Sequence, residues 1–309
     1  MSRPPSVAVH QQEPPHPERS VDAIAVRDGV CVLGMHRSGT SLVAGLLGIL
    51  GVELGPEEAM LPPLPANPKG YWELADLVKI NNLILAEFGG SWDRLPEMPD
   101  GWEQSERLEG LRERATTVLR DRFSGSAHWG WKDPRTCVTL PFWQSLVPGL
   151  RFVICIRNPV DVADSLRTRE GHGRPWEEGI IDWLRHTALA LIQSSGSPRI
   201  VVHYEDFFED LEARVKTLAR FLGLERRLEE PGVLEQVREF VDPGLVHAHT
   251  TTARMAADPR VASEAAGLYM MLRLASALEA RGEPGRDPTA ADWGAIDRLA
   301  GRYLGRLLE

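Results

Sequence analysis

The sequence of 309 residues has only three cysteines, only four lysines and no long hydrophobic run. The cysteines, Cys31, Cys137 and Cys155, are far apart and each lies in or beside an apolar, strand-like segment, so we expect buried free thiols and neither a disulfide nor a zinc site. The longest apolar stretch, residues 42–52, is shorter than the about 20 residues that a membrane-spanning helix needs. The first twenty residues contain no apolar segment of the kind that a signal peptide requires. We therefore expect a cytoplasmic protein without a transmembrane segment.

Positive charge is also scarce. Lys and Arg together number 35 against 44 Asp and Glu, which gives a formal net charge of −9. Nucleic acids and anionic membranes are bound mainly through an excess of Lys and Arg. The composition therefore argues against a nucleic-acid partner, and any anion that the protein binds needs a local site.

The order of patterns along the chain predicts the fold class. Residues 1–27 are rich in Pro, Glu, Gln and His, which predicts a flexible arm. Beyond it, strand-like apolar runs at 30–33, 129–132, 152–156 and 200–203 alternate with helical patterns at 41–50, 103–123, 160–167, 176–194 and 207–222. Such alternation predicts an α/β fold with a mainly parallel central sheet and helices on both faces. We expect one domain over residues 28–309, in which residues 281–288 form a linker to a last helix that ends at Leu308.

A glycine-rich loop follows the first predicted strand, Gly34-Met-His-Arg-Ser-Gly-Thr-Ser41, and we name residues 34–41 the phosphate loop. Glycines let backbone N–H groups approach a phosphate, and the helix that follows directs its unpaired N–H groups and its positive dipole end to the same place. The spacing of Gly34 and Gly39 fits a nucleoside-triphosphate loop, but Thr40 stands where that motif has Lys, and the cation is Arg37 instead. Three hydroxyl side chains add hydrogen-bond donors: Ser38, Thr40 and Ser41.

A second anion site is indicated where the predicted strand 152–156 ends. Arg157 ends this strand, and Asn158-Pro159 is a typical start for the next helix. Ligands of open α/β sheets bind at the carboxyl ends of the strands. Ser165 lies further along the helix and offers a hydroxyl from the same side. We name Arg157 and Ser165 the second anion site.

Both sites resemble those of the sulfotransferases that use 3′-phosphoadenosine-5′-phosphosulfate (PAPS). The phosphate loop is similar to their 5′-phosphosulfate loop, and the segment from Arg157 to Ser165 is similar to their 3′-phosphate segment. The resemblance covers about residues 29–224 and implies the P-loop sulfotransferase fold. It also implies that residues 37–41 bind the 5′-phosphosulfate, with Arg37 stabilising the leaving group, 3′-phosphoadenosine-5′-phosphate (PAP). Arg157 and Ser165 would bind the 3′-phosphate and Tyr204 would contact the adenine.

The segment Trp129-Gly-Trp-Lys132-Asp-Pro resembles the Lys-Asp-Pro motif of tyrosylprotein sulfotransferases, whose lysine stabilises the transition state. Lys132 is therefore expected in that role. Sulfuryl transfer also needs a general base that takes the proton of the acceptor. Glu73 is preferred because it follows an aromatic pair that can desolvate it, and Glu58 and Asp133 remain alternatives.

These features together predict transfer of the sulfuryl group of PAPS to a hydroxyl, or as second choice an amine, of a small-molecule, carbohydrate or lipid acceptor, with release of PAP and without a metal. Two alternatives are a P-loop small-molecule kinase, which would bind ATP with magnesium, and a non-catalytic adenylate-binding protein. Six tryptophans provide flat apolar surface that suits an acceptor: Trp72, Trp92, Trp102, Trp129, Trp131 and Trp176.

Overall fold

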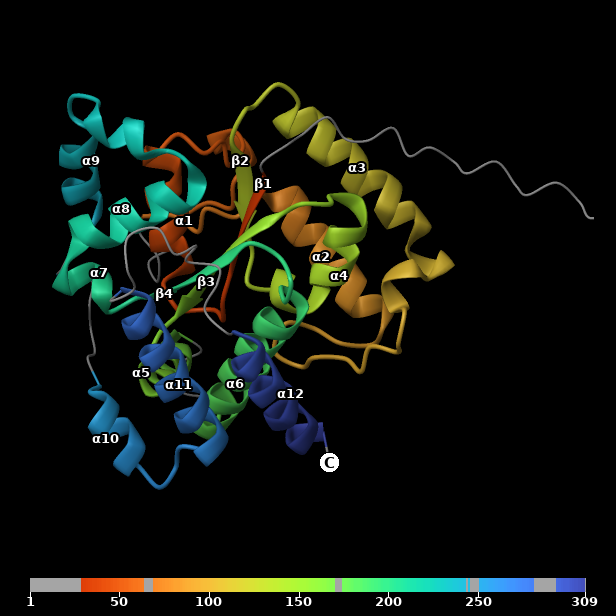
Figure 1. The fold of residues 1–309 in the computed structure, drawn as a ribbon. Coiled ribbons are helices and arrows are strands. Elements are labelled where there is room, and N and C mark those ends of the chain that lie inside the picture. The colour runs from red at the N-terminus through yellow and green to blue at the C-terminus, as the bar shows by residue number, and fades with distance from the viewer. Residues whose placement is uncertain are drawn as a thin grey trace, which may run out of the picture.

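A parallel sheet forms the centre of the protein (Figure 1). The structure, a computed structural model, describes residues 29–63, 69–169, 174–242, 244, 250–280 and 293–308. Within these residues the sheet has four strands in the order β2-β1-β3-β4, and each neighbouring pair is parallel. The strands are β1 (Gly29–Leu33), β2 (Trp129–Lys132), β3 (Arg151–Ile156) and β4 (Arg199–His203). The predicted parallel sheet is confirmed, and the carboxyl ends of all four strands lie at one edge.

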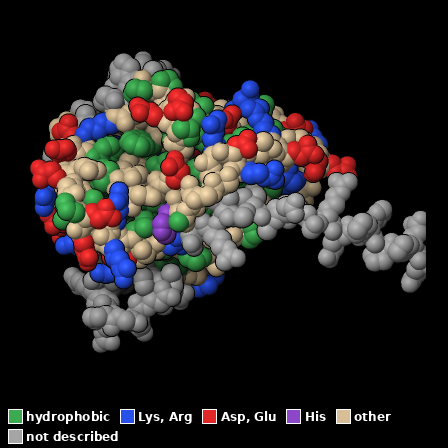
Figure 2. Space-filling view, turned by 90° about the horizontal axis from the view of Figure 1, so that it is seen from above, with side chains coloured by type: hydrophobic (Ala, Val, Ile, Leu, Met, Phe, Trp, Pro, Cys, Tyr) green, Lys and Arg blue, Asp and Glu red, His purple; other side chains and the backbone are tan. Residues whose placement is uncertain are grey.

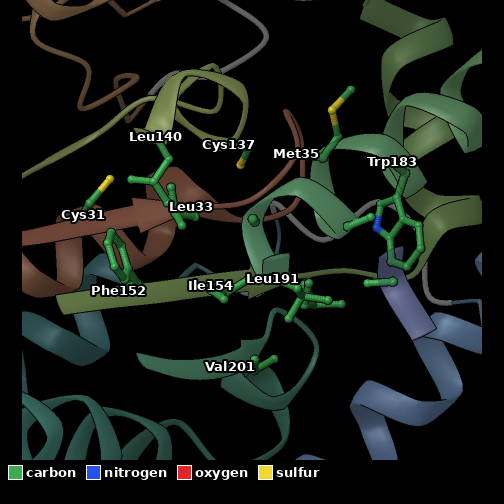
Figure 3. Packing of buried hydrophobic residues seen from close by; sticks show 14 of the residues in the cluster. Cys31, Leu33, Met35, Cys137, Leu140, Phe152, Ile154, Trp183, Leu191 and Val201 are labelled. Atoms are coloured by element: carbon green, nitrogen blue, oxygen red, sulfur yellow. The ribbon is translucent and has the colours of Figure 1, made fainter. Parts of the chain in front are cut away.

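The strands are apolar along almost their whole length because both faces of the sheet are covered. Successive side chains of β1 point to opposite faces, so Cys31 and Leu33 belong to one hydrophobic cluster while Val30 and Val32 belong to the other. Figure 3 shows the cluster on the first face, where side chains of β1 and β3 meet residues of two helices, α4 (Thr136–Leu146) and α6 (Trp176–Gln193). The three cysteines are free and buried, as predicted.

Helices cover both faces, which confirms the predicted layers. One cluster takes its helical residues from α1 (Thr40–Ile49), α7 (Asp206–Glu209), α8 (Leu211–Leu222) and α9 (Val233–Phe240). The larger cluster, besides α4 and α6, uses a second set of helices: α2 (Ala75–Glu87), α3 (Glu109–Phe123), α5 (Pro159–Arg169), α10 (Thr252–Ala257), α11 (Ser263–Ala280) and α12 (Trp293–Leu308).

Two predicted helices differ from the structure. The helix predicted over 103–123 begins at Glu109, because the hydroxyl of Ser105 accepts the N–H of Arg107 and caps a separate 3-10 turn before it. The helix predicted over 207–222 is divided into α7 (Asp206–Glu209) and α8, because the carboxylate of Asp210 accepts the N–H of Ala213 and starts a new helix.

Some predictions fall on other parts of the chain. The arm at residues 1–27 and the linker at 281–288 lie outside the described residues, so the single domain from 28 to 309 stays a prediction. The last helix ends at Leu308 as expected. Among the helices that the structure describes, none combines the length and the apolar character that crossing a membrane requires. Figure 2 shows acidic and basic side chains interspersed on one face.

Candidate active site

The phosphate loop connects β1 to α1, and its backbone is shaped by two glycines. Gly34 has a φ of 138°, and a Cβ there would lie 2.5 Å from the carbonyl oxygen of Cys155, so only glycine lets β1 leave the sheet so close to β3. Gly39 has a φ of 87° and precedes the first residue of α1. A Cβ at Gly39 would lie 2.3 Å from the ring of Tyr204, so this aromatic side chain packs directly on the loop.

The hydroxyl groups of the loop have different surroundings. The Oγ of Ser38 is buried and has no hydrogen-bond partner within the described part of the chain. Ser41 donates from its Oγ to the carbonyl oxygen of Tyr71 at 3.2 Å. Thr40 is buried at the start of α1, where the N–H groups of the first turn lack partners within the helix. The loop thus has the open donors that an oxyanion needs.

Arg157 follows β3 directly and is also buried. Its Nη1 donates to the carbonyl oxygen of Arg37 at 3.2 Å, and its guanidinium lies 4.6 Å from the ring centre of Tyr204. Its Nε is buried and finds no partner among the residues that the structure describes. Asn158 starts α5 as predicted, since its Oδ1 accepts the N–H of Val160 at 3.0 Å. Arg157 is therefore held in place while part of its hydrogen-bonding capacity remains open.

The phosphate loop and the second anion site are in direct contact. The Nε of Arg37 donates to the Oγ of Ser165 at 2.8 Å, although 128 positions separate the two residues in the sequence. Burial, and then the positive charges of Arg157 and Arg169, lower the pKa of Arg37. Positive charge is thus concentrated beside the phosphate loop, which favours the binding of an anion.

One cavity of about 790 Å³ joins these groups. It is lined by nine of the residues singled out in the sequence: Arg37, Gly39, Thr40, Ser41, Glu73, Lys132, Arg157, Ser165 and Tyr204. Ser38 is buried and is not among the lining residues. The two anion sites are thus on one side of the molecule, at the ends of the adjacent strands β1 and β3.

Lys132 and Glu73 form a buried ion pair in this cavity. The Nζ of Lys132, at the end of β2, is 2.5 Å from the Oε1 of Glu73, which precedes α2. The Nη1 of Arg135 lies 3.6 Å from the other carboxylate oxygen of Glu73. A carboxylate and an ammonium group are thereby placed side by side next to the phosphate loop, which suits proton transfer combined with stabilisation of negative charge.

The two other candidates for the general base lie elsewhere. Glu58 is exposed in a 3-10 turn and is not among the residues that line the cavity. Asp133 is buried, and its carboxylate is bonded to Asn81 and Arg135 away from the cavity. Of the three carboxylates, Glu73 is the one that lines the cavity.

Several lining residues were not predicted. His36 of the phosphate loop lines the cavity and packs its ring 4.5 Å from that of Trp92, and burial, followed by the charge of Arg135, holds its pKa well below the usual value. Phe240 packs edge-on against Trp72, and the Nζ of Lys69 donates to its carbonyl oxygen at 2.5 Å. Phe240 lies in the part of the sequence where no motif was visible, so only its aromatic character was available as a signal.

The expected use of the tryptophans is corrected by the structure. Trp72 lines the cavity, but Trp102, Trp129, Trp131 and Trp176 are buried in the hydrophobic core. Their large apolar area stabilises the packing of the helices against the sheet and does not form an acceptor surface.

Comparison with known proteins identifies the family. The family model of the sulfotransferases matches residues 29–229 of this chain. The chain therefore belongs to the sulfotransferase family. The central parallel sheet with the phosphate loop after β1 is its α/β P-loop sulfotransferase fold. A comparison with curated protein sequences finds no match.

Solved structures with similarity to this chain include three of low sequence identity. The sulfotransferase domain of the olefin synthase from Synechococcus PCC 7002 is 15% identical over 97% of this chain and 99% of that chain, with a TM-score of 0.41. Sulfotransferase STF1 from Mycobacterium tuberculosis is 16% identical over 76% of this chain and 75% of that chain, with a TM-score of 0.42. Retinol dehydratase, in a complex with androsterone and the inactive cofactor PAP, is 15% identical over 91% of this chain and 80% of that chain, with a TM-score of 0.34.

Proposed function

We propose that the protein transfers the sulfuryl group of PAPS to a hydroxyl of a small-molecule, carbohydrate or lipid acceptor and releases PAP. The observation that carries this proposal is the contact between the phosphate loop and the second anion site, made by Arg37 and Ser165, in the cavity that also holds Lys132 and Glu73. A nucleotide with phosphates at both its 5′ and 3′ positions suits two oxyanion sites that share one cavity. An amine is the second choice of acceptor, and the cytoplasmic location stays a prediction.

In this proposal PAPS is held by the phosphate loop and the second anion site, which meet at one cavity. The N–H groups at the start of α1, together with Arg37 and Ser38, bind the 5′-phosphosulfate. Arg157, through its Nε, and Ser165, which lines the same cavity, bind the 3′-phosphate. Tyr204, which lies under the guanidinium of Arg157, contacts the adenine.

The chemical step needs no covalent intermediate with the protein. The acceptor oxygen attacks the sulfur, and the bond between that sulfur and the bridging oxygen of the 5′-phosphate breaks. Glu73 takes the proton of the acceptor hydroxyl, and Lys132 and Arg37 balance the negative charge that develops on the sulfuryl and bridging oxygens. The products are the sulfated acceptor and PAP, with the proton on Glu73.

The first test is calorimetric titration with PAP and with ATP, each in EDTA and again with magnesium. We expect PAP to bind in EDTA with a higher affinity than ATP has under either condition. ATP binding that requires magnesium and exceeds PAP binding would instead favour a kinase.

The second test measures turnover. PAPS is incubated with a panel of phenols, sugars and lipid alcohols, and mass spectrometry detects an added sulfuryl group. Glu73→Gln and Lys132→Ala should each reduce the rate by about 100-fold or more. Equal rates in both variants and in the wild type would refute the assigned chemistry, and PAP binding without any turnover would favour the non-catalytic alternative.

A further inference from the structure

The carboxylate of Glu73 contacts two cations, one on each oxygen. The Nζ of Lys132 is 2.5 Å from Oε1, and the Nη1 of Arg135 is 3.6 Å from Oε2. In the proposed reaction the ammonium group of Lys132 has to turn toward the sulfuryl oxygens. Once it does so, Arg135 is the cation that still holds Glu73 beside the acceptor.

Arg135 is itself fixed by its neighbour Asp133. The Oδ1 of Asp133 accepts both the backbone N–H of Arg135 at 3.0 Å and its Nη1 at 2.9 Å. Burial lowers the pKa of Arg135, but the charges of Asp133 and Glu73 outweigh burial and raise it. The guanidinium is therefore a permanent positive charge with a defined position.

Asn81, on α2, fixes Asp133 in turn. Its Nδ2 donates to the Oδ2 of Asp133 at 2.8 Å and lies 3.3 Å from the Oγ1 of Thr136. Its Oδ1 accepts hydrogen bonds from the Oγ1 of Thr139 at 2.6 Å and from the Nε1 of Trp143 at 2.8 Å. Since the side chain of Asn81 is fully buried and uses both ends of its amide, it has a single orientation.

We propose that Arg135 is a positioning residue for Glu73, and that Asp133 and Asn81 maintain its position through a continuous buried network. This inference rests on the proposed function, because it concerns the same base. The alternative is that the network only packs α2 against α4. Both helices contribute to it, so a loss of stability alone does not distinguish the two roles.

The test compares Arg135→Gln with a control, Arg112→Gln. The control also removes a largely buried arginine, but Arg112 lies on α3 and does not line the cavity. The assay follows conversion of PAPS to PAP with the acceptor found in the panel, or with PAPS alone, where water is the acceptor. We expect Arg135→Gln to reduce kcat by about 100-fold, because a displaced base is no longer aligned with the acceptor. The KM for PAPS and the Kd for PAP should stay within about 3-fold of wild type.

Two further variants separate positioning from folding. Arg135→Lys, which keeps the charge but not the planar group, should recover part of kcat, and Asp133→Asn should reduce kcat with unchanged PAP affinity. Arg112→Gln should behave as wild type in both measurements. Two results would overturn the positioning role. One is an unchanged kcat in Arg135→Gln. The other is that Arg135→Gln and Asp133→Asn both lose Tm and PAP affinity to the same extent as kcat. An active wild type with an equally active Arg135→Gln refutes this inference alone, whereas a wild type that binds PAP without converting PAPS refutes the proposed function and the inference with it.

Discussion

Replacement of Gly39 by alanine tests how the phosphate loop and Tyr204 are coupled. Gly39 precedes α1 with a φ of 87°, and an alanine in this left-handed region costs about 1–2 kcal/mol. The new Cβ would lie 2.3 Å from the Cδ2 of Tyr204, so the ring has to move by roughly 1 Å to restore ordinary contact. This movement disturbs the contact between Tyr204 and Arg157, which is worth about 0.5–2 kcal/mol. We expect PAP affinity to fall by about 10-fold or more.

Gly232 provides a matched control. It precedes α9 with a φ of 85°, and an added Cβ there meets nothing within 4 Å. Gly232→Ala should therefore carry the same backbone strain, lower Tm by a few degrees and leave PAP affinity unchanged. Calorimetric titration with PAP and thermal unfolding of both variants make the comparison. The reasoning is refuted if Gly39→Ala binds PAP as tightly as Gly232→Ala does.

Three other predictions concern stability and reactivity. Asp297→Ala leaves Arg199 buried without the carboxylate that it now contacts at 2.7 Å. Urea denaturation should therefore show a free energy of unfolding about 3–5 kcal/mol lower, with unchanged PAP affinity. A loss below about 1 kcal/mol would contradict this. Burial raises the pKa of all three cysteine thiols, so a disulfide reagent at pH 8 should modify them only after unfolding, and rapid modification of the native protein would be inconsistent with the structure. Burial lowers the pKa of His186 to about 3 and that of His203 to about 4, so between pH 6.5 and those values the two side chains bind protons only in the unfolded chain. Each should therefore remove up to about 1.4 kcal/mol of stability per pH unit as the pH falls below 6.5. In His203→Gln the free energy of unfolding should fall less steeply with falling pH.

The sequence predicted the sheet well because each strand is a short apolar run with a distinct end. Helices α2 and α4 were not predicted. Helix α4 contains Pro141 and several β-branched residues, which disfavour a helix locally, and it forms because eight of its residues are buried against the sheet and α6. Local propensity was overridden by tertiary packing.

For the site, motif order along the chain indicated the phosphate loop and the second anion site, because strand ends bring such residues together in any parallel sheet. The pairing of Glu73 with Lys132 was not visible, since 59 positions separate them and no local pattern fixes their distance. The network through Asn81 was equally hidden, because a buried asparagine has no sequence signature until its partners are known. Side-chain contacts between distant segments are decided by packing.

The most direct test of the central claim compares two ligands in two proteins. PAP and adenosine 5′-monophosphate, which lacks the 3′-phosphate, are titrated calorimetrically into the wild type and into Arg157→Ala, in EDTA. The account predicts that the wild type prefers PAP, and that Arg157→Ala loses about 10- to 100-fold in PAP affinity. Its affinity for the monophosphate should fall much less, because only the contacts of Arg157 with Arg37 and Tyr204 are then lost. If Arg157→Ala weakens both ligands equally, or neither, then Arg157 does not bind a 3′-phosphate and the assignment of the donor is wrong.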